Sequence, residues 1–236
     1  MIIISKRKIV VLLLFVFLAG ISVAFFHEEE TSVFSQKPTK TVVLDAGHGF
    51  PDGGAIGMNG TIESTLNLKI TTTAEKLLRK KGYRVILTRC NEDSLSDNGK
   101  TISEKKRNDM KKRLEITNNS GADIFVSIHM NKYTDSRYRG AQVIYSSNFV
   151  QSETLADVIQ NELCKLTENK SKRTHLEAPK SIYLLKNACI PAVIVECGFL
   201  SNFEEEQLLL TEDYRNKVAE AIVCGIENYY KKEYSE

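Results

Sequence analysis

The order of apolar and polar positions along the chain predicts strands and helices in alternation. Short apolar runs are typical of buried strands, and they cover Thr41–Leu44, Arg84–Thr88, Ile124–His129, Gln142–Ser146, Ile182–Leu185 and Ala192–Glu196. Longer stretches with apolar residues three or four positions apart predict helices, and these cover Glu63–Lys81, Ser103–Ser120, Glu153–Leu166 and Glu212–Lys232. This alternation favours an α/β fold, a single domain with a mostly parallel twisted sheet flanked by helices on both faces.

The predicted helix Ser103–Ser120 differs from the others because charged residues dominate it. Its apolar stripe is narrow and consists of Met110, Leu114 and Thr117. We interpret the charges as a solvated face, since the polar side of a surface helix normally carries them.

The N-terminus has a pattern of its own, in which Lys6–Lys8 precede the uncharged apolar run Ile9–Phe26. Basic residues stay on the cytoplasmic side of a membrane, so the rest of the chain is expected outside it. The run is either a signal peptide, cut after Ser22–Ala24, or an uncut membrane anchor, and both alternatives remain open. We therefore expect a signal peptide or membrane anchor over 1–26, a tether over 27–39 and a folded domain over 40–234.

Composition favours a folded protein that does not bind nucleic acid. The chain has 236 residues, of which 42% are hydrophobic and 26% charged, as is ordinary for a globular domain. The net charge of +2 reflects the basic residues before the apolar run, so no basic patch remains to neutralise phosphates. The 5 cysteines form no CxxC pair, and an exported chain without a disulfide framework suits a bacterial surface protein.

Residues capable of catalysis lie at the ends of three predicted strands. His48 lies shortly after the first strand, His129 ends the third, and Glu196 ends the last. Ligands of open parallel sheets bind outside the carboxyl ends of the strands. We therefore expect His48, His129 and Glu196 at one edge of the sheet, although a single histidine at a strand end is more often structural.

Two imidazoles with nearby carboxylates suit zinc, which in catalytic sites takes three protein ligands and keeps one position open. Glu63 is the better candidate for the third ligand, because the glycine-rich loop before it can fold it back toward His48. Asp52 is a rival ligand, and a helix-capping charge is the structural alternative for Glu63. Glu196 remains as the acid/base group.

Four segments together resemble the zinc-dependent N-acetylmuramoyl-L-alanine amidases of type 3. They are Leu44–Gly49, Ile62–Glu63, Ser127–Asn131 and Val195–Asn202, in this order. The resemblance implies zinc held by His48, Glu63 and His129, with Glu196 as the catalytic carboxylate. It also implies hydrolysis of the amide between the lactyl group of N-acetylmuramic acid and the L-alanine of the peptidoglycan stem peptide. The roles of Asn131 and Asn202, which match motif positions, stay open.

The short chain resembles most the sporulation-specific cortex amidase of this family, because it leaves no room for wall-binding modules. That subgroup implies muramic-δ-lactam formation in spore cortex, with the enzyme in the forespore intermembrane space. The segment Ser147–Ser181 is too short for the long self-blocking helix of some relatives. A regulatory partner protein is therefore a further expectation.

Three other functions compete with this one. The first is another zinc peptidase or carboxypeptidase acting on wall peptides, and the second is a non-catalytic wall-binding protein. The third is a cysteine hydrolase that uses Cys197 with His129. It is disfavoured because Cys197 follows Glu196 in an extended strand, so the two side chains face opposite ways.

Overall fold

A computed structural model describes residues 40–96, 98–166 and 173–233 of the chain. The predicted export segment and tether lie outside these residues, so the expected division of the chain stays a prediction. No helix in the described part is both long and apolar enough to cross a membrane. All 5 cysteines are described, and each is a free thiol.

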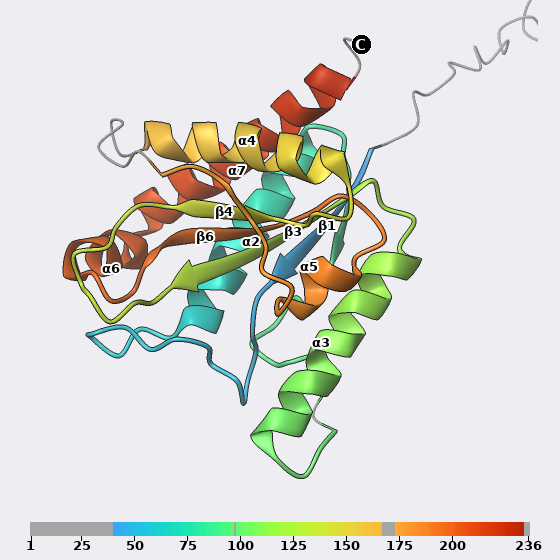
Figure 1. The fold of residues 1–236 in the computed structure, drawn as a ribbon. Coiled ribbons are helices and arrows are strands. Elements are labelled where there is room, and N and C mark those ends of the chain that lie inside the picture. Colours follow the sequence, from blue (N-terminus) through green and yellow to red (C-terminus); the bar gives the residue numbers. More distant parts are fainter. Residues whose placement is uncertain (1–39, 97, 167–172, 234–236) are drawn as a thin grey trace, which may run out of the picture. The chain divides into compact units, whose positions relative to one another are not determined.

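One sheet of six strands forms the centre of the domain, in the order β2-β1-β3-β6-β4-β5 (Figure 1). The strands are β1 (Thr41–Ala46), β2 (Arg84–Leu87), β3 (Ile124–Asn131), β4 (Gln142–Tyr145), β5 (Leu176–Glu177) and β6 (Ala192–Phe199). β4 pairs with β6 antiparallel, and the other neighbouring pairs are parallel. The predicted fold class is confirmed.

Helices cover both faces of the sheet, and Figure 1 shows α4 and α7 on one side and α3 and α5 on the other. They are α2 (Glu63–Lys80), α3 (Ile102–Asn119), α4 (Val150–Lys165), α5 (Tyr183–Asn187), α6 (Phe203–Leu210) and α7 (Glu212–Glu233). The continuous apolar runs of β1, β3 and β6 follow from this, because these central strands are buried on both faces.

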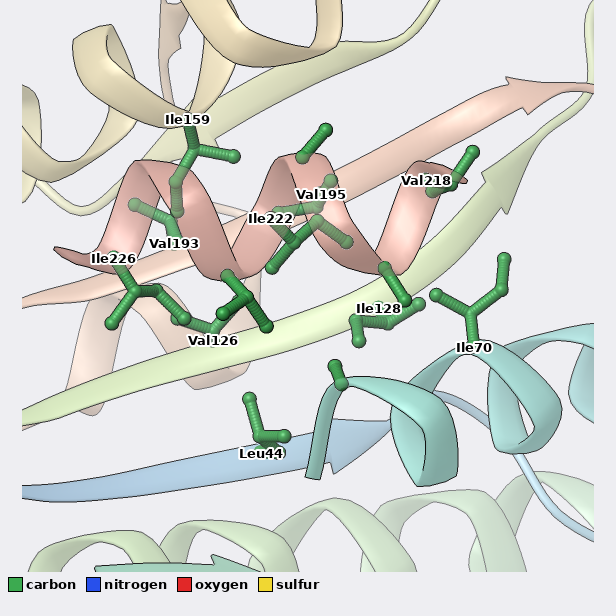
Figure 2. Packing of buried hydrophobic residues seen from close by; sticks show 14 of the residues in the cluster. Leu44, Ile70, Val126, Ile128, Ile159, Val193, Val195, Val218, Ile222 and Ile226 are labelled. Carbon is green, nitrogen blue, oxygen red and sulfur yellow. The ribbon is translucent and has the colours of Figure 1, made fainter. Parts of the chain in front are cut away.

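The larger core lies between the sheet and the helices α2, α4 and α7. Figure 2 shows its centre, where Ile222 and Ile226 of α7 approach Val126 and Val193 of the sheet. A smaller core on the opposite face includes Phe125, and α5 contributes to it. Apolar burial of this kind is the dominant favourable contribution to folding.

The expected strand Ile182–Leu185 is wrong, because this run begins the short helix α5. The amide of Lys186 donates to the carbonyl of Ile182 over 3.0 Å, which closes a helical turn. A short apolar run fits a buried helix as well as a strand, and periodicity alone cannot separate them. Leu184 and Leu185 still enter the smaller core. The short strand β5 and helix α6 were not expected.

The interpretation of α3 as a helix with only solvated charges is also wrong. Its buried residues are polar or charged, namely Asp109, Arg113 and Thr117. Of the expected stripe, only Thr117 is buried, while Met110 and Leu114 are partly buried. The side of α3 that faces the sheet is therefore mainly charged. These charged groups lie beneath the segment that carries His48.

Candidate active site

Three of the predicted site residues meet at the carboxyl end of the parallel strands. His48 follows β1, His129 lies near the end of β3, and Glu63 is the first residue of α2. Their candidate ligand atoms all lie within 4.8 Å of one another. Oε1 of Glu63 is 3.3 Å from Nε2 of His48 and 3.0 Å from Nδ1 of His129. The structure brings this set together, and its role as a metal site stays a prediction.

The Glu63 carboxylate is fixed by the backbone around it. Its Oε2 accepts a hydrogen bond from the amide of Ala55 (2.7 Å), and its Oε1 accepts one from the amide of Met130 (3.1 Å). The side-chain amide of Asn67 donates to the same Oε1 over 3.3 Å. A carboxylate oriented by so many donors is suited to bind a cation at a defined point.

Two glycines let the chain lie against these ligands. A Cβ at Gly54 would be 2.5 Å from Oε2 of Glu63, and one at Gly47 would be 2.2 Å from the His129 ring. Gly54 also has a φ of +72°, which favours glycine. The glycine-rich loop that the sequence indicates thus folds closely around the ligand set. Two nitrogens and a carboxylate form a donor set that fits zinc.

Asp52, the rival ligand, lies on the other side of the His48 ring. Its Oδ2 is 2.9 Å from Nδ1 of His48, the nitrogen that faces away from Glu63. Its Oδ1 forms an ion pair of 2.7 Å with Nζ of Lys106. Asp52 is held there by a turn, because its backbone exchanges two hydrogen bonds with Gly49. It therefore orients the imidazole, as carboxylates next to metal-binding histidines commonly do.

The cluster is organised around the negative charge of Glu63. Burial alone would raise the pKa of Glu63, but the hydrogen bonds to His129 and His48 outweigh it and hold that pKa well below its usual value. Burial would lower the pKa of His48, yet hydrogen bonds to Asp52 and Glu63 raise it to about 9. A proton and a metal ion therefore compete for the same His48 nitrogen.

Glu196 stands beside this cluster without belonging to it. It is the partner of His129 in the register of β3 and β6. Among the described residues, nothing forms a hydrogen bond with its buried Oε2. Burial raises the pKa of Glu196 to about 7, although the charge of His129 partly opposes the shift. A carboxyl group that titrates near neutrality suits proton transfer in both directions.

Asn131 and Asn202, whose roles the sequence leaves open, make hydrogen bonds near the ends of β3 and β6. The side chain of Asn202 caps α6, accepting from the amide of Glu205 over 3.1 Å, and donates to the carbonyl of Ser136 over 2.8 Å. The backbone carbonyl of Asn131 accepts from the amide of Leu200 over 2.8 Å. These contacts support the strand ends that carry His129 and Glu196.

Cys197 does not fit a nucleophile. Its side chain is buried in the larger core, on the face opposite Glu196. Burial raises the pKa of the Cys197 thiol well above its usual value, so the reactive thiolate is disfavoured.

A cleft of about 300 Å³ opens beside His48 and His129. One wall comes from α3 and includes Met110, and the other is the start of α5 with Tyr183. The cleft therefore reaches both histidines of the set, whereas Glu63 and Glu196 do not line it.

Buried charges beneath the site are the main feature that sequence reasoning missed. Asp45 is fully buried, and Arg113 is 2% exposed and Arg89 3% exposed. Arg113 forms ion pairs with Asp45 and Asp109. Burial would raise the pKa of Asp45, but the charge of Arg113 and hydrogen bonds from Ser127 and Thr88 keep it below its usual value. Asp45 lies within the motif that carries His48. A charged residue directly after a buried strand was the signal in the sequence that it has a role beside the site.

Comparison with known proteins finds a family model that matches most of the domain. The profile of the N-acetylmuramoyl-L-alanine amidase family matches residues 42–228. The germination-specific N-acetylmuramoyl-L-alanine amidase of Bacillus subtilis is 37% identical over 195 residues, which cover 81% of this chain and 80% of that protein. The amidase AmiA of Escherichia coli is 29% identical over an alignment of 264 positions, which covers 90% of this chain and 87% of the relative.

Two solved structures are similar over most of the domain. The CwlD amidase from Clostridioides difficile, solved in complex with the GerS lipoprotein, is 42% identical with a TM-score of 0.78. The match covers 82% of this chain and 99% of that one. The catalytic domain of CwlV, an N-acetylmuramoyl-L-alanine amidase from Bacillus (Paenibacillus) polymyxa var. colistinus, is 31% identical with a TM-score of 0.70 and covers 82% and 99%.

Proposed function

The chain belongs to the N-acetylmuramoyl-L-alanine amidase family, and on this basis we propose that it is a zinc-dependent enzyme. The ligands would be His48 through Nε2, Glu63 through its carboxylate and His129 through Nδ1. The bond hydrolysed joins the lactyl group of N-acetylmuramic acid to the L-alanine of the peptidoglycan stem peptide. The observation that carries the proposal is the convergence of three candidate ligand atoms within 4.8 Å of one another, next to Glu196, whose buried Oε2 has no hydrogen-bond partner among the described residues.

The residues divide into those that bind and those that move a proton. Zinc bound there supplies the Lewis acidity that amide hydrolysis needs. Asp52 holds the His48 ring so that Nε2 faces Glu63. The hydrogen bonds from Ala55 and Met130 keep the Glu63 carboxylate in place while substrate enters and product leaves.

Glu196 is proposed as the proton carrier. Its Oε2 has no partner among the described residues, so it is free to accept a proton from the attacking water. It would then give that proton to the nitrogen of L-alanine as the C–N bond breaks, which releases the stem peptide as a neutral amine. Burial favours the protonated form of Glu196, which helps this carboxylate to accept the proton that it then gives to the leaving nitrogen.

The finer biological role is part of the same proposal. The relative from Bacillus subtilis is named as germination-specific, which supports a role in spore cortex, with muramic-δ-lactam as the later product. We place the enzyme in the forespore intermembrane space, exported or anchored by residues 1–26, with 27–39 as tether and 40–234 as the amidase domain. A partner protein is supported by the solved complex of CwlD with a lipoprotein.

The proposal is tested on the full chain, purified in detergent, by zinc analysis together with mass spectrometry of digested muropeptides. We expect zinc in the protein and free stem peptides in the digest. Loss of a terminal residue from intact muropeptides would instead indicate a carboxypeptidase, and glycan binding without zinc or turnover would indicate a wall-binding protein.

Two variants separate the proposed roles. Glu196→Gln should keep zinc and lower kcat by about 10²–10⁴-fold, the usual contribution of a general acid–base group. His129→Ala should lose the metal. A Glu196→Gln enzyme with normal kcat, or a His129→Ala protein with normal zinc content, would contradict the assignment.

A further inference from the structure

His48 adopts an unfavourable backbone conformation that other contacts must stabilise. Its φ is +60°, and it is the one described residue other than glycine with a positive φ. Side chains of L-residues disfavour this region by about 1–2 kcal/mol, so neighbouring contacts have to stabilise it. The surroundings of the His48 backbone therefore matter for where its imidazole points.

Two buried arginines bind the carbonyl groups of this segment. Nη1 of Arg113 donates to the carbonyl of Ala46 over 2.7 Å, and its Nη2 donates to the carbonyl of His48. Arg89 donates from Nε to Ala46 over 2.8 Å and from Nη2 to Gly47 over 3.0 Å. Three consecutive carbonyls thus point toward guanidinium groups, and we call this arrangement the carbonyl clamp.

The clamp has a rigid base. Arg113 forms ion pairs with Asp45 of β1 and with Asp109 one turn earlier on α3. Oδ1 of Asp109 in turn accepts from the amide of Leu95 over 2.7 Å. A buried ion network adds little net stability compared with apolar packing. Its geometric precision, rather than its contribution to folding, is the property that distinguishes it.

The same helix also reaches the side chain of His48. Lys106, on the face of α3 that carries Asp109 and Arg113, forms an ion pair with Asp52 over 2.7 Å. Asp52 then contacts Nδ1 of His48 over 2.9 Å. Both the backbone and the imidazole of His48 are therefore held from α3.

We infer that Arg113 is a positioning residue that sets the metal affinity of the site by fixing the His48 backbone, with α3 as the rigid element behind it. The inference rests on the proposed metal site. Lysine in place of Arg113 keeps the positive charge but cannot donate to two carbonyls and two carboxylates at once. The effect of that change on His48 is therefore separable from the effect of the charge.

The test compares the wild-type chain with Arg113→Lys and with Lys112→Met, an exposed neighbour on α3. Zinc affinity is measured by competition with a chelator, and ligand geometry by the visible spectrum of the cobalt-substituted protein. Arg113→Lys should weaken zinc binding by about 10–100-fold, as losses next to metal ligands do, and should change the cobalt bands. Lys112→Met should match the wild type in both. A folded Arg113→Lys protein with wild-type affinity and spectrum would overturn the inference.

Two further measurements keep the test decisive. Should Arg113→Lys fail to fold, Asp109→Asn is the second variant. It removes the negative charge paired with Arg113 and leaves one acceptor oxygen for two donors, Nε of Arg113 and the amide of Leu95. It should weaken zinc binding several-fold, whereas unchanged affinity would overturn the inference. Amide exchange of the metal-free chain addresses the clamp directly, because Arg113→Lys should speed exchange at Gly47 and Gly49, whose amides are hydrogen-bonded. Unchanged exchange would count against the clamp. A wild-type chain that binds no zinc would contradict the proposed function, while the exchange result still judges the clamp.

Discussion

The helices on the two faces of the sheet bury different kinds of side chains. On one face, α7 buries apolar residues and two tyrosines, and α4 buries mainly apolar residues. Figure 2 shows aliphatic side chains of this core, such as Ile159 and Ile222. Under α3 the buried residues of the helix are Asp109, Arg113 and Thr117. Apolar packing is non-directional and tolerant, whereas ion pairs and hydrogen bonds demand fixed geometry. The first face therefore serves mainly stability, and the second serves the placement of the site.

The largest effect on activity is expected when a methyl group is added to a glycine beside the site. In Gly47→Ala the new Cβ would lie 2.2 Å from the His129 ring, so the ring must move. We expect activity to fall on the order of 100-fold, the usual cost of displacing a catalytic group by about 1 Å. Zinc affinity, measured by chelator competition, should fall with it.

Gly225→Ala is the matched change in the apolar face. Its Cβ would lie 2.6 Å from Cα of Ile159, so α4 and α7 must separate. Overpacking of this kind costs about 1–3 kcal/mol, measured by urea denaturation, while the folded fraction should keep its zinc affinity. If Gly47→Ala kept full activity, the close fit around His129 would have no functional meaning.

Truncation of the apolar core should affect stability alone. Ile222 is fully buried in the larger core. Ile222→Ala should lower the free energy of unfolding by about 2–5 kcal/mol, with kcat/KM unchanged at a temperature where the protein is folded. A large loss of kcat/KM in the folded protein would show that the two faces are coupled more tightly than their composition suggests.

The pH dependence of the metal-free chain should come from the site. The pKa of His48 is raised to about 9, so its stabilising contribution is present below pH 6.5 and is lost as the pH rises through 9. The pKa of Glu196 is raised to about 7, so its ionisation destabilises the fold increasingly above pH 4.5. Both effects make stability fall with rising pH, by at most about 3 kcal/mol each.

Urea denaturation between pH 5 and 9.5 measures this slope. Glu196→Gln should flatten it below pH 7, and saturating zinc should flatten it above, since the metal replaces the proton on His48. Glu115→Gln, at an exposed site of α3, is the control and should leave the slope unchanged. A wild-type chain whose stability does not vary over this range would contradict the pKa shifts.

The smallest effect is expected on the solvated side of α3. Lys112 and Glu115 form an ion pair of 2.8 Å, with exposed fractions of 55% and 57%. Lys112→Met should change the free energy of unfolding by less than about 0.5 kcal/mol. An effect as large as that of a buried core residue would mean that the whole of α3, and not only its buried side, supports the site.

The sequence predicts much of this molecule because its main signals are local. Continuous apolar runs identify the central strands, and the strand ends bring His48, His129 and Glu196 to one edge. The glycine-rich loop made Glu63 the better candidate than Asp52 for the third ligand. In the structure both residues contact the imidazole of His48, but through different nitrogens.

Other features depend on partners that are distant in sequence. Arg113 looks like one charge among many on α3, and only the contact with Asp45, 68 positions away, makes it a buried ion pair. The run Ile182–Leu185 fits a strand or a helix by its pattern, and in the structure it begins α5, which packs into the smaller core. The start of α6, by contrast, had a local signal that was overlooked, because Asn202 is a favourable helix cap.

The position of Glu63 at the first turn of α2 has one further consequence. His129 is far along the chain from the other two residues of the set, 66 positions after Glu63. A metal held by all three would join two strand ends to the start of a helix. It would stabilise the folded chain over the unfolded one, in which these ligands are not held together. Loading with metal would then protect the protein against proteases outside the cytoplasm, so the same ion would govern both its activity and its lifetime.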